Sequence, residues 1–132
     1  MIERETSLRR VLEVMRHPAV APYFERAQKP DFVPPCGDAA HYLKLGRGFI
    51  AYLVRQHLTE MHGCLLPGDV GKGSLTLVRE HFAYLFASGV KLIRTAHSKE
   101  HRRASAMCRA LGMRKNEELS MGELNVYEVR NG

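Results

Sequence analysis

The chain has 132 residues, a length typical of one domain, and its 45% hydrophobic residues are enough to bury a core. No apolar run approaches the ~20 residues of a membrane-spanning helix, and the N-terminus lacks the apolar segment of a secretory signal. We therefore expect a cytoplasmic protein without membrane contact. A net charge of +6 attracts polyanions of any kind. Without an aromatic–basic RNA-binding pattern or a helix-turn-helix signature, nucleic acid is not the expected partner.

The metal-binding residue types do not form a convincing site. Three cysteines without a CxxC spacing are expected to be reduced thiols, namely Cys36, Cys64 and Cys108. The residues from His97 to His101 match the H-x-x-E-H string of a metalloprotease, which requires both histidines on one continuous helix. Because Ser98 is expected to cap that helix, His97 would lie outside it. We predict that the chain binds no metal.

The N-terminal part of the chain, up to residue 38, predicts helices and a loop. Apolar residues within 8–15 recur at i, i+3, i+4 and i+7, which is one helical face. A Thr-Ser pair before this segment can cap the helix, and a His-Pro pair after it should end it. A second short helix is expected within 18–27, with Tyr23 facing inward. Residues 30–38 contain three prolines and are expected to form a loop.

The rest of the chain alternates strand and helix patterns. The expected strands are residues 41–45, 49–54, 60–66, 90–95, 114–119 and 124–129. The expected helices are residues 74–87 and 98–111. The first three strands follow one another and predict an antiparallel meander. The whole order predicts an α/β fold in a single domain, with a mixed, mostly antiparallel sheet flanked by helices. Its core would span residues 40–130, and strands of its sheet would separate near Leu65 and Leu92.

A glycine-rich loop joins the third strand to the next helix. Pro67 is followed by Gly68-Asp69-Val70-Gly71-Lys72-Gly73-Ser74, and the helix opens directly from it. Free backbone N–H groups and the helix dipole make such a helix start an anion site. The phosphate-loop motif of nucleotide hydrolases would need Ser or Thr where Gly73 stands, so that class is excluded. The alternative interpretation is an ordinary glycine-rich turn from strand to helix.

The order of these pieces resembles the GCN5-related N-acetyltransferases, the GNAT superfamily. There, a strand ending in Pro is followed by an Arg/Gln-x-x-Gly-x-Gly/Ala loop, a helix, a strand and a helix ending Leu-Gly-Phe. Pro67, Gly71-Lys72-Gly73 and Leu111-Gly112-Met113 occupy matching places. The resemblance implies transfer of an acetyl group from acetyl-CoA to an amine of a small molecule or protein. The implied cofactor-binding residues are Cys64, Leu65, Leu66, Gly71, Lys72, Gly73, Ser74 and His101.

Several positions depart from the family pattern. Val70 stands at the Arg/Gln place, and Leu75 stands at the closing Gly/Ala place. Sliding the alignment so that Gly68 comes first keeps the glycine pair but breaks the spacing to Pro67. Either alignment keeps the backbone amides that hold the CoA pyrophosphate in the family. The family's usual first strand would have to be short or lie within residues 1–5.

The catalytic residues are also implied by the resemblance. In the family, a Glu on or near the strand before the loop deprotonates the amine, and a Tyr on the last helix protonates the leaving thiolate. Glu60 and His62 share one strand face and are both candidate bases, with a surface pair as the alternative. Cys108 occupies the Tyr place, where a buried thiol is more often inert packing. Tyr127, on the last strand, is a substitute donor, and His101 occupies the family's Asn place.

These departures leave two hypotheses about function. The first is a small N-acetyltransferase that uses acetyl-CoA. The second is a non-enzymatic protein on the same scaffold. In the general character of its sequence, including residues 59–74 and 101–113, the chain also resembles small head-assembly proteins of short-tailed phages. That resemblance implies a virion-assembly partner or a homodimer, located in the host cytoplasm or the virion.

Overall fold

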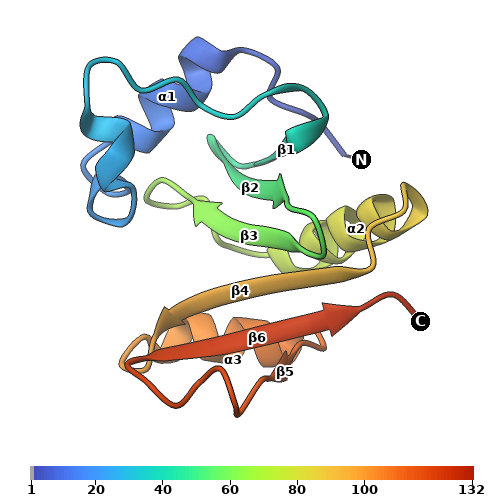
Figure 1. Cartoon of the computed structure of the whole chain (residues 1–132). Helices are drawn as coiled ribbons and strands as arrows, with labels where there is room; N and C mark the ends of the chain where they lie inside the picture. Colours follow the sequence, from blue (N-terminus) through green and yellow to red (C-terminus); the bar gives the residue numbers. More distant parts are fainter. Residues whose placement is uncertain (1) are drawn as a thin grey trace.

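Short apolar strands form one mixed sheet with α-helices on its faces, as seen in a computed structural model that describes residues 2–132. The elements are α1 (Leu8–Arg16), the 3-10 turns η1 (Ala21–Tyr23), η2 (Glu25–Gln28) and η3 (Gly37–Ala39), β1 (Ala40–Leu45), β2 (Gly48–Val54), β3 (Thr59–Cys64), α2 (Ser74–Ala87), β4 (Leu92–Ser98), α3 (Arg102–Ala110), β5 (Arg114–Lys115) and β6 (Leu124–Arg130). The strand order is β1-β2-β3-β4-β6-β5, and only β3 and β4 pair in parallel (Figure 1). This confirms the predicted α/β fold.

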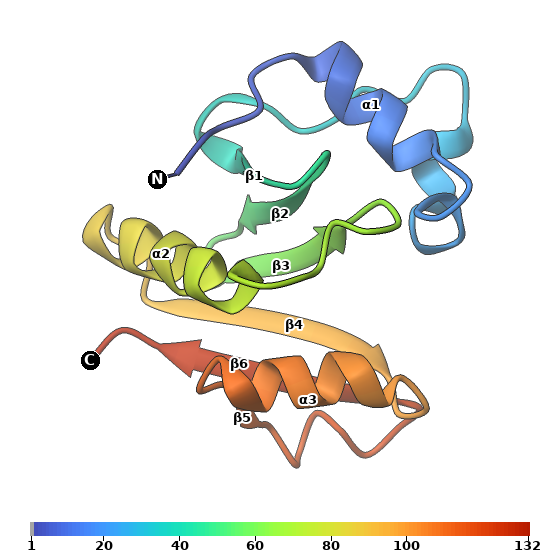
Figure 2. The ribbon, with the colours of Figure 1, turned by 180° about the vertical axis from the view of Figure 1, so that it is seen from behind.

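The two faces of the sheet are covered differently. Side chains from α2 and α3 pack on one face with Leu43, Tyr52 and Ile93, and Figure 2 shows both helices on that side. On the other face, α1 packs over β1 to β3 around Phe49 and Cys64. Among residues 2–132, no helix covers this second face over β4 and β6 (Figure 1). The described helices include none that is long and apolar enough to span a bilayer.

The N-terminal residues add a pairing at the β1 edge of the sheet. The Glu5 amide donates to the Tyr42 carbonyl at 2.7 Å, and the Lys44 amide donates to the Glu3 carbonyl at 2.7 Å. Arg4 forms an isolated antiparallel bridge with Leu43. In place of the short first strand expected within residues 1–5, the described residues there form only this isolated bridge and its two hydrogen bonds, while Met1 lies outside the described residues.

The start of α3 differs from its prediction. β4 continues through Ser98, which pairs with Leu124, and the chain then turns so that His101 becomes the helix cap. The Nδ1 atom of His101 accepts a hydrogen bond from the Ala104 amide at 3.3 Å. The prediction that Ser98 caps this helix is therefore wrong. β4 extends past the expected cap because its backbone pairing with β6 continues through Ser98. A local capping pattern does not reveal this pairing.

Three further predictions needed correction. The helix expected within 18–27 is two 3-10 turns, and Tyr23 is 71% exposed rather than inward. The strand expected at 114–119 ends at Lys115, because the Asn116 side chain accepts the Leu119 amide at 3.0 Å and turns the chain. The strand expected at 60–66 ends at Cys64.

One buried carboxylate holds the loop between β3 and α2. Asp69 accepts the amides of Leu66 at 2.7 Å and Gly48 at 2.9 Å on Oδ2, and that of Arg47 at 2.8 Å on Oδ1. The β1–β2 turn approaches so closely that a Cβ on Gly48 would lie 2.2 Å from the Cys64 carbonyl oxygen. Asp69 thus fastens the glycine loop to a turn about 20 residues earlier in the chain.

Replacing Asp69 should therefore be costly. In Asp69→Asn, the amide nitrogen cannot accept, so at least one buried N–H loses its partner. We expect the free energy of unfolding to fall by roughly 2–4 kcal/mol. Urea denaturation measures this as a lower midpoint at unchanged slope. Asp31→Asn, the same charge change at an exposed site, is the control. An equal loss in both variants would contradict this role for Asp69.

Stability should also depend on pH through His81. This fully buried histidine belongs to α2, with its Nδ1 atom 3.1 Å from the hydroxyl of Tyr52 on β2, and burial lowers its pKa to about 4. The unfolded chain takes up a proton near pH 6.5 and the folded chain only near pH 4, so stability is full above pH 6.5 and falls below it. The loss should reach about 3 kcal/mol at pH 4.

The measurement is urea denaturation between pH 7.5 and pH 4, in the parent and in a double variant, His81→Leu with Tyr52→Phe. The double variant removes both hydrogen-bonding partners, so neither is left unsatisfied. Its stability should fall less with decreasing pH than that of the parent. Identical pH dependences would show that His81 is not the responsible group.

Candidate functional site

The parallel strands β3 and β4 pair at one end only and separate towards the other (Figure 1). Their register is limited to Thr59 with Ile93 and Glu60 with Arg94. The Thr95 hydroxyl donates to the Met61 carbonyl at 2.9 Å. Backbone groups two residues apart on a strand point the same way, so the peptide groups of Gly63 face the gap. This open strand edge can pair with an extended ligand that carries amides.

The sequence predicted that the strands would separate near Leu65 and Leu92. Leu65 follows the open end of β3, as predicted. Leu92 instead lies beside the paired end of β4 and pairs with Arg130 of β6. The prediction for Leu92 is therefore wrong, because β4 begins at the paired end and its free residues come later.

The glycine loop stands at the N-terminus of α2, as predicted, and it is partly self-satisfied. The Gly71 amide donates to the Ser74 hydroxyl at 2.8 Å, and the Ser74 amide donates to the Gly71 carbonyl at 3.1 Å. Within residues 2–132, four neighbouring amides donate to no protein acceptor: those of Lys72, Gly73, Leu75 and Thr76. With the positive end of the α2 dipole, they form an arrangement that suits an anion.

Of the three glycines in the loop, Gly71 and Gly73 lie beside the free amides, and a different physical reason favours glycine at each of these two positions. Gly73 has a φ of +91°, a conformation that other residues rarely adopt. Gly71 has no left-handed φ, and a Cβ built on it would meet nothing within 4 Å. The fold therefore does not require glycine at 71. Its bare backbone leaves room for a ligand instead.

A cavity of about 360 Å³ lies beside the loop, between the start of α2 and the side of α3. Its lining residues are Val70, Gly71, Ser74, Leu75, Arg103, Ala106, Met107 and Ala110. Apart from Arg103, the lining side chains are uncharged. Val70, where the family has Arg or Gln, is 43% exposed at this cavity. This cavity, called the groove below, therefore offers backbone amides and apolar surface, with little side-chain charge.

The other predicted cofactor residues differ in what they can offer a ligand, since Cys64 and Leu66 bury their side chains while Lys72 and His101 are exposed. Cys64 is fully buried on the α1 face, and burial raises the pKa of its thiol. Leu66 is buried in the same cluster, and Leu65 packs on the α2 side. Lys72 is exposed on the loop. His101 uses Nδ1 to cap α3, so only its Nε2 atom remains for a ligand.

Glu60 and His62 form a hydrogen-bonded pair on the sheet face that also carries α1. The Nε2 atom of His62 lies 3.2 Å from Oε2 of Glu60, and Nε of Arg55 lies 3.5 Å from Oε1. Burial opposes ionisation of Glu60, but the bond with His62 and the charge of Arg55 outweigh it, so the pKa of Glu60 is lowered. The two-residue spacing predicted this shared face.

The candidate proton donors lie on the opposite face. Cys108 is buried against Leu111 and Met113, and burial raises the pKa of its thiol to about 11. Tyr127 is also buried, and its hydroxyl oxygen accepts a hydrogen bond from Arg109 at 3.2 Å. These surroundings favour packing as the role of Cys108.

The H-x-x-E-H string does not form a metalloprotease helix. His97 lies on β4 and His101 precedes α3, so the two are not on one continuous helix. Their rings are 6.1 Å apart, and the Nε2 atom of His97 is 2.7 Å from the Ser105 hydroxyl. Across residues 2–132, no group of three or more His, Cys, Asp or Glu side chains is arranged to hold a metal.

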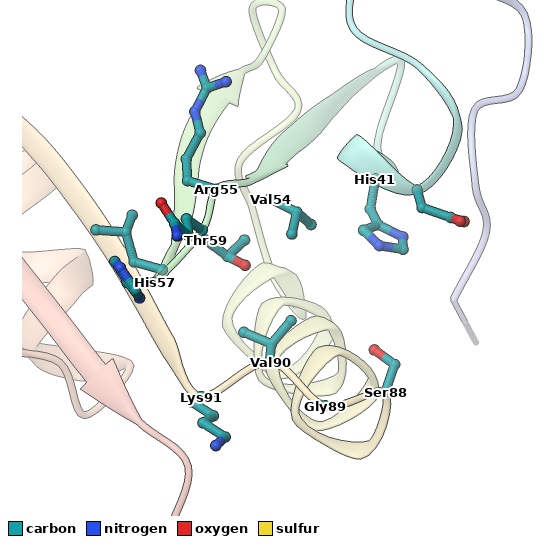
Figure 3. Close-up of a pocket in the computed structure, with 12 residues that line it drawn as sticks. His41, Val54, Arg55, His57, Thr59, Ser88, Gly89, Val90 and Lys91 are labelled. Carbon is teal, nitrogen blue, oxygen red and sulfur yellow. The ribbon is translucent and has the colours of Figure 1, made fainter.

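A second cavity, of about 600 Å³, lies at the other end of α2. His41, Val54 and Val90 face this space, while Arg55 and Lys91 extend outward from it (Figure 3). The 14 residues of α2 separate it from the glycine loop by roughly 20 Å. Sequence reasoning missed this cavity, because its walls come from three loops without a shared motif.

No protein-family model and no curated protein sequence matches the chain. Solved structures do resemble it over almost its whole length. A domain from Methanocaldococcus jannaschii aligns with 99% of this chain and 97% of its own, at 15% identity and a TM-score of 0.60. A putative acetyltransferase of the GNAT family from Desulfovibrio desulfuricans aligns with 98% of each chain, at 11% identity and a TM-score of 0.59.

An acetyltransferase from Bacillus subtilis, solved in complex with CoA, aligns with 99% of this chain and 98% of its own, at 14% identity and a TM-score of 0.56. Two further acetyltransferase structures align with 70% of this chain, which spans only 60% of their length. Identities this low bear on the fold alone. The chain has the fold of the GCN5-related N-acetyltransferases, as its sequence predicted.

Proposed function

We propose that this protein is an N-acetyltransferase that moves an acetyl group from acetyl-CoA to an amine. The single observation that carries the proposal is the open strand edge of β3 beside a loop of free amides at the start of α2. An extended thioester ligand with two amides and a pyrophosphate matches both features. The Bacillus subtilis neighbour, which holds CoA, supports the same ligand class.

The residues around the groove fit CoA in charge and shape. The amides of Lys72, Gly73, Leu75 and Thr76 suit a pyrophosphate, and Gly71 leaves room for it to approach. The edge at Gly63 suits the amides of the pantetheine arm, whose apolar parts match Met107 and its neighbours. When bound, acetyl-CoA supplies a thioester carbonyl that an amine can attack.

The reacting groups would approach from opposite sides of the sheet. Glu60 and His62, on the α1 face, are the proposed base for the amine. Tyr127 is the proposed donor to the departing thiolate. Arg109 donates to its hydroxyl oxygen, which leaves the O–H proton free to be given away.

The acceptor amine, on a small molecule or a protein, and a cytoplasmic location also belong to this proposal. The alternative role in phage head assembly receives no support from the solved structures that resemble the chain. A homodimer stays a prediction. The groove with free amides favours a binding function over a purely structural one.

Gly71 provides the test of cofactor binding. Acetyl-CoA at 100 times its Kd should stabilise the parent by about 2.7 kcal/mol, seen as a raised Tm. Gly71→Val should abolish this shift without unfolding the protein, because its side chain meets only open space where the ligand must approach. Gly73 is less suitable, since its φ of +91° would strain any replacement.

Gly122→Val is the matched control. Gly122 also lacks a left-handed φ and has nothing within 4 Å of a built Cβ, but it lies in the turn before β6. This variant should keep the full thermal shift. A parent protein without any shift would defeat the proposed function.

Cys108 and Tyr127 should behave differently under replacement. Cys108→Ala should cost roughly 1 kcal/mol of stability through a small cavity and leave both the acetyl-CoA shift and turnover nearly unchanged. Tyr127→Phe should slow turnover while the shift persists. Steady-state assays alongside thermal shifts separate the two effects. Slower turnover in Cys108→Ala with an intact shift would make the thiol the donor.

A further inference from the structure

Both oxygens of Glu60 are already engaged. Oε1 faces the guanidinium of Arg55 at 3.5 Å, and Oε2 faces Nε2 of His62 at 3.2 Å. Arg94 is the neighbour of Glu60 on β4, and it is itself paired with Glu128 through a hydrogen bond of 2.7 Å. Glu60 thus lies between the guanidinium of Arg55 and the imidazole of His62. An incoming ammonium would find no unshared oxygen on it.

These contacts also fix which nitrogen of His62 carries the proton. With its pKa lowered, Glu60 stays a carboxylate near neutral pH, and a carboxylate can only accept hydrogen bonds. The Nε2 atom of His62 must therefore be the donor in the neutral ring. Its lone pair then resides on Nδ1, to which no group among residues 2–132 donates.

The imidazole is held on a second side by an aromatic ring. Phe24, at the turn before η2, meets it edge-on, with ring centroids 5.9 Å apart and planes at 74°. The side chain of His62 is still 40% exposed. The ring is thus oriented by Glu60 and Phe24 and remains accessible to a second substrate.

We propose that Nδ1 of His62 is the atom that accepts the proton of the acceptor amine, and that Glu60 and Arg55 are positioning residues. This inference rests on the proposed function. It assigns separate roles to two residues that the strand pattern alone leaves equivalent.

The proposed transfer moves one acetyl group and two protons. An N–H proton of the acceptor ammonium moves to Nδ1, giving an imidazolium whose charge the Glu60 carboxylate stabilises at 3.2 Å. The freed lone pair forms the C–N bond with the acetyl carbon. The C–S bond breaks, and its electrons leave on the CoA thiolate, which takes a proton from the Tyr127 hydroxyl. The attacking nitrogen loses its second N–H proton, which restores the Tyr127 hydroxyl, and the imidazolium of His62 releases the first proton to water. The amide product and free CoA result, and no other reactant is needed.

The first test needs only the protein. Long-range ¹H–¹⁵N NMR at pH 8.5 reports which ring nitrogen of His62 is protonated. The parent should show the Nε2–H tautomer. Glu60→Gln, whose amide can either donate or accept, should lose this preference, whereas Glu123→Gln, an exposed site elsewhere, should keep it. An Nδ1–H tautomer in the parent would overturn the inference, whatever activity is found.

The second test is turnover with acetyl-CoA and an amine. His62→Ala should lose at least about a hundredfold in kcat, and added imidazole should restore part of it. Glu60→Gln should lose roughly tenfold and gain nothing from imidazole. His57→Ala, an exposed histidine on the same hairpin as Arg55, should match the parent.

The acetyl-CoA thermal shift should persist in all three variants. A fully active His62→Ala beside an inactive Glu60→Gln would make Glu60 the base and refute the assignment. A parent without thermal shift or turnover would instead refute the proposed function, and the NMR result would still decide the orientation of His62.

Discussion

The buried carboxylate of Asp69 is the constraint on which the proposed cofactor site depends. A glycine-rich loop has a large conformational entropy to lose, and backbone amides bind an anion well only when they are held in place. Asp69 holds the loop at its base by accepting amides from Leu66 and from the β1–β2 turn. Further along the loop, the amides of Lys72 and Gly73 donate to no acceptor among residues 2–132. Asp69 thus fixes the base of the loop, while the tip of the loop keeps amides available for a ligand.

The sheet itself divides the proposed chemistry. β3 and β4 pair over two residues only, so within residues 2–132 the part of β3 beyond Glu60 has no backbone pairing with a parallel neighbour. The face with α2 and α3 offers the groove of Met107 and Arg103, and the face with α1 offers the pair of Glu60 and His62. A thioester in the gap would meet an amine from the other side. In the proposed reaction, the two substrates therefore approach from opposite faces of the sheet.

The sequence predicted features that follow from local periodicity and missed those set by partners distant in the chain. The two-residue strand period placed Glu60 and His62 together, and the glycine loop at the start of α2 followed from its composition. The cap of α3 was wrong because pairing with β6 extends β4 through Ser98. The role of Asp69 was invisible, since its partners Arg47 and Gly48 lie on another turn. Long-range hydrogen bonds leave no periodic mark in a sequence.

The departures from the family pattern fall on side chains, while the backbone features of the site remain. Val70 and Cys108 replace an Arg or Gln and a Tyr, yet the free amides after Gly71 and the open edge at Gly63 depend on main chain alone. Backbone donors are preserved by any sequence that keeps the loop conformation. Recognition of a pyrophosphate can therefore outlast the loss of a charged loop residue. Proton transfer has no such backbone substitute, so the proposed reaction assigns it to the side chains that remain, His62 on one face and Tyr127 on the other.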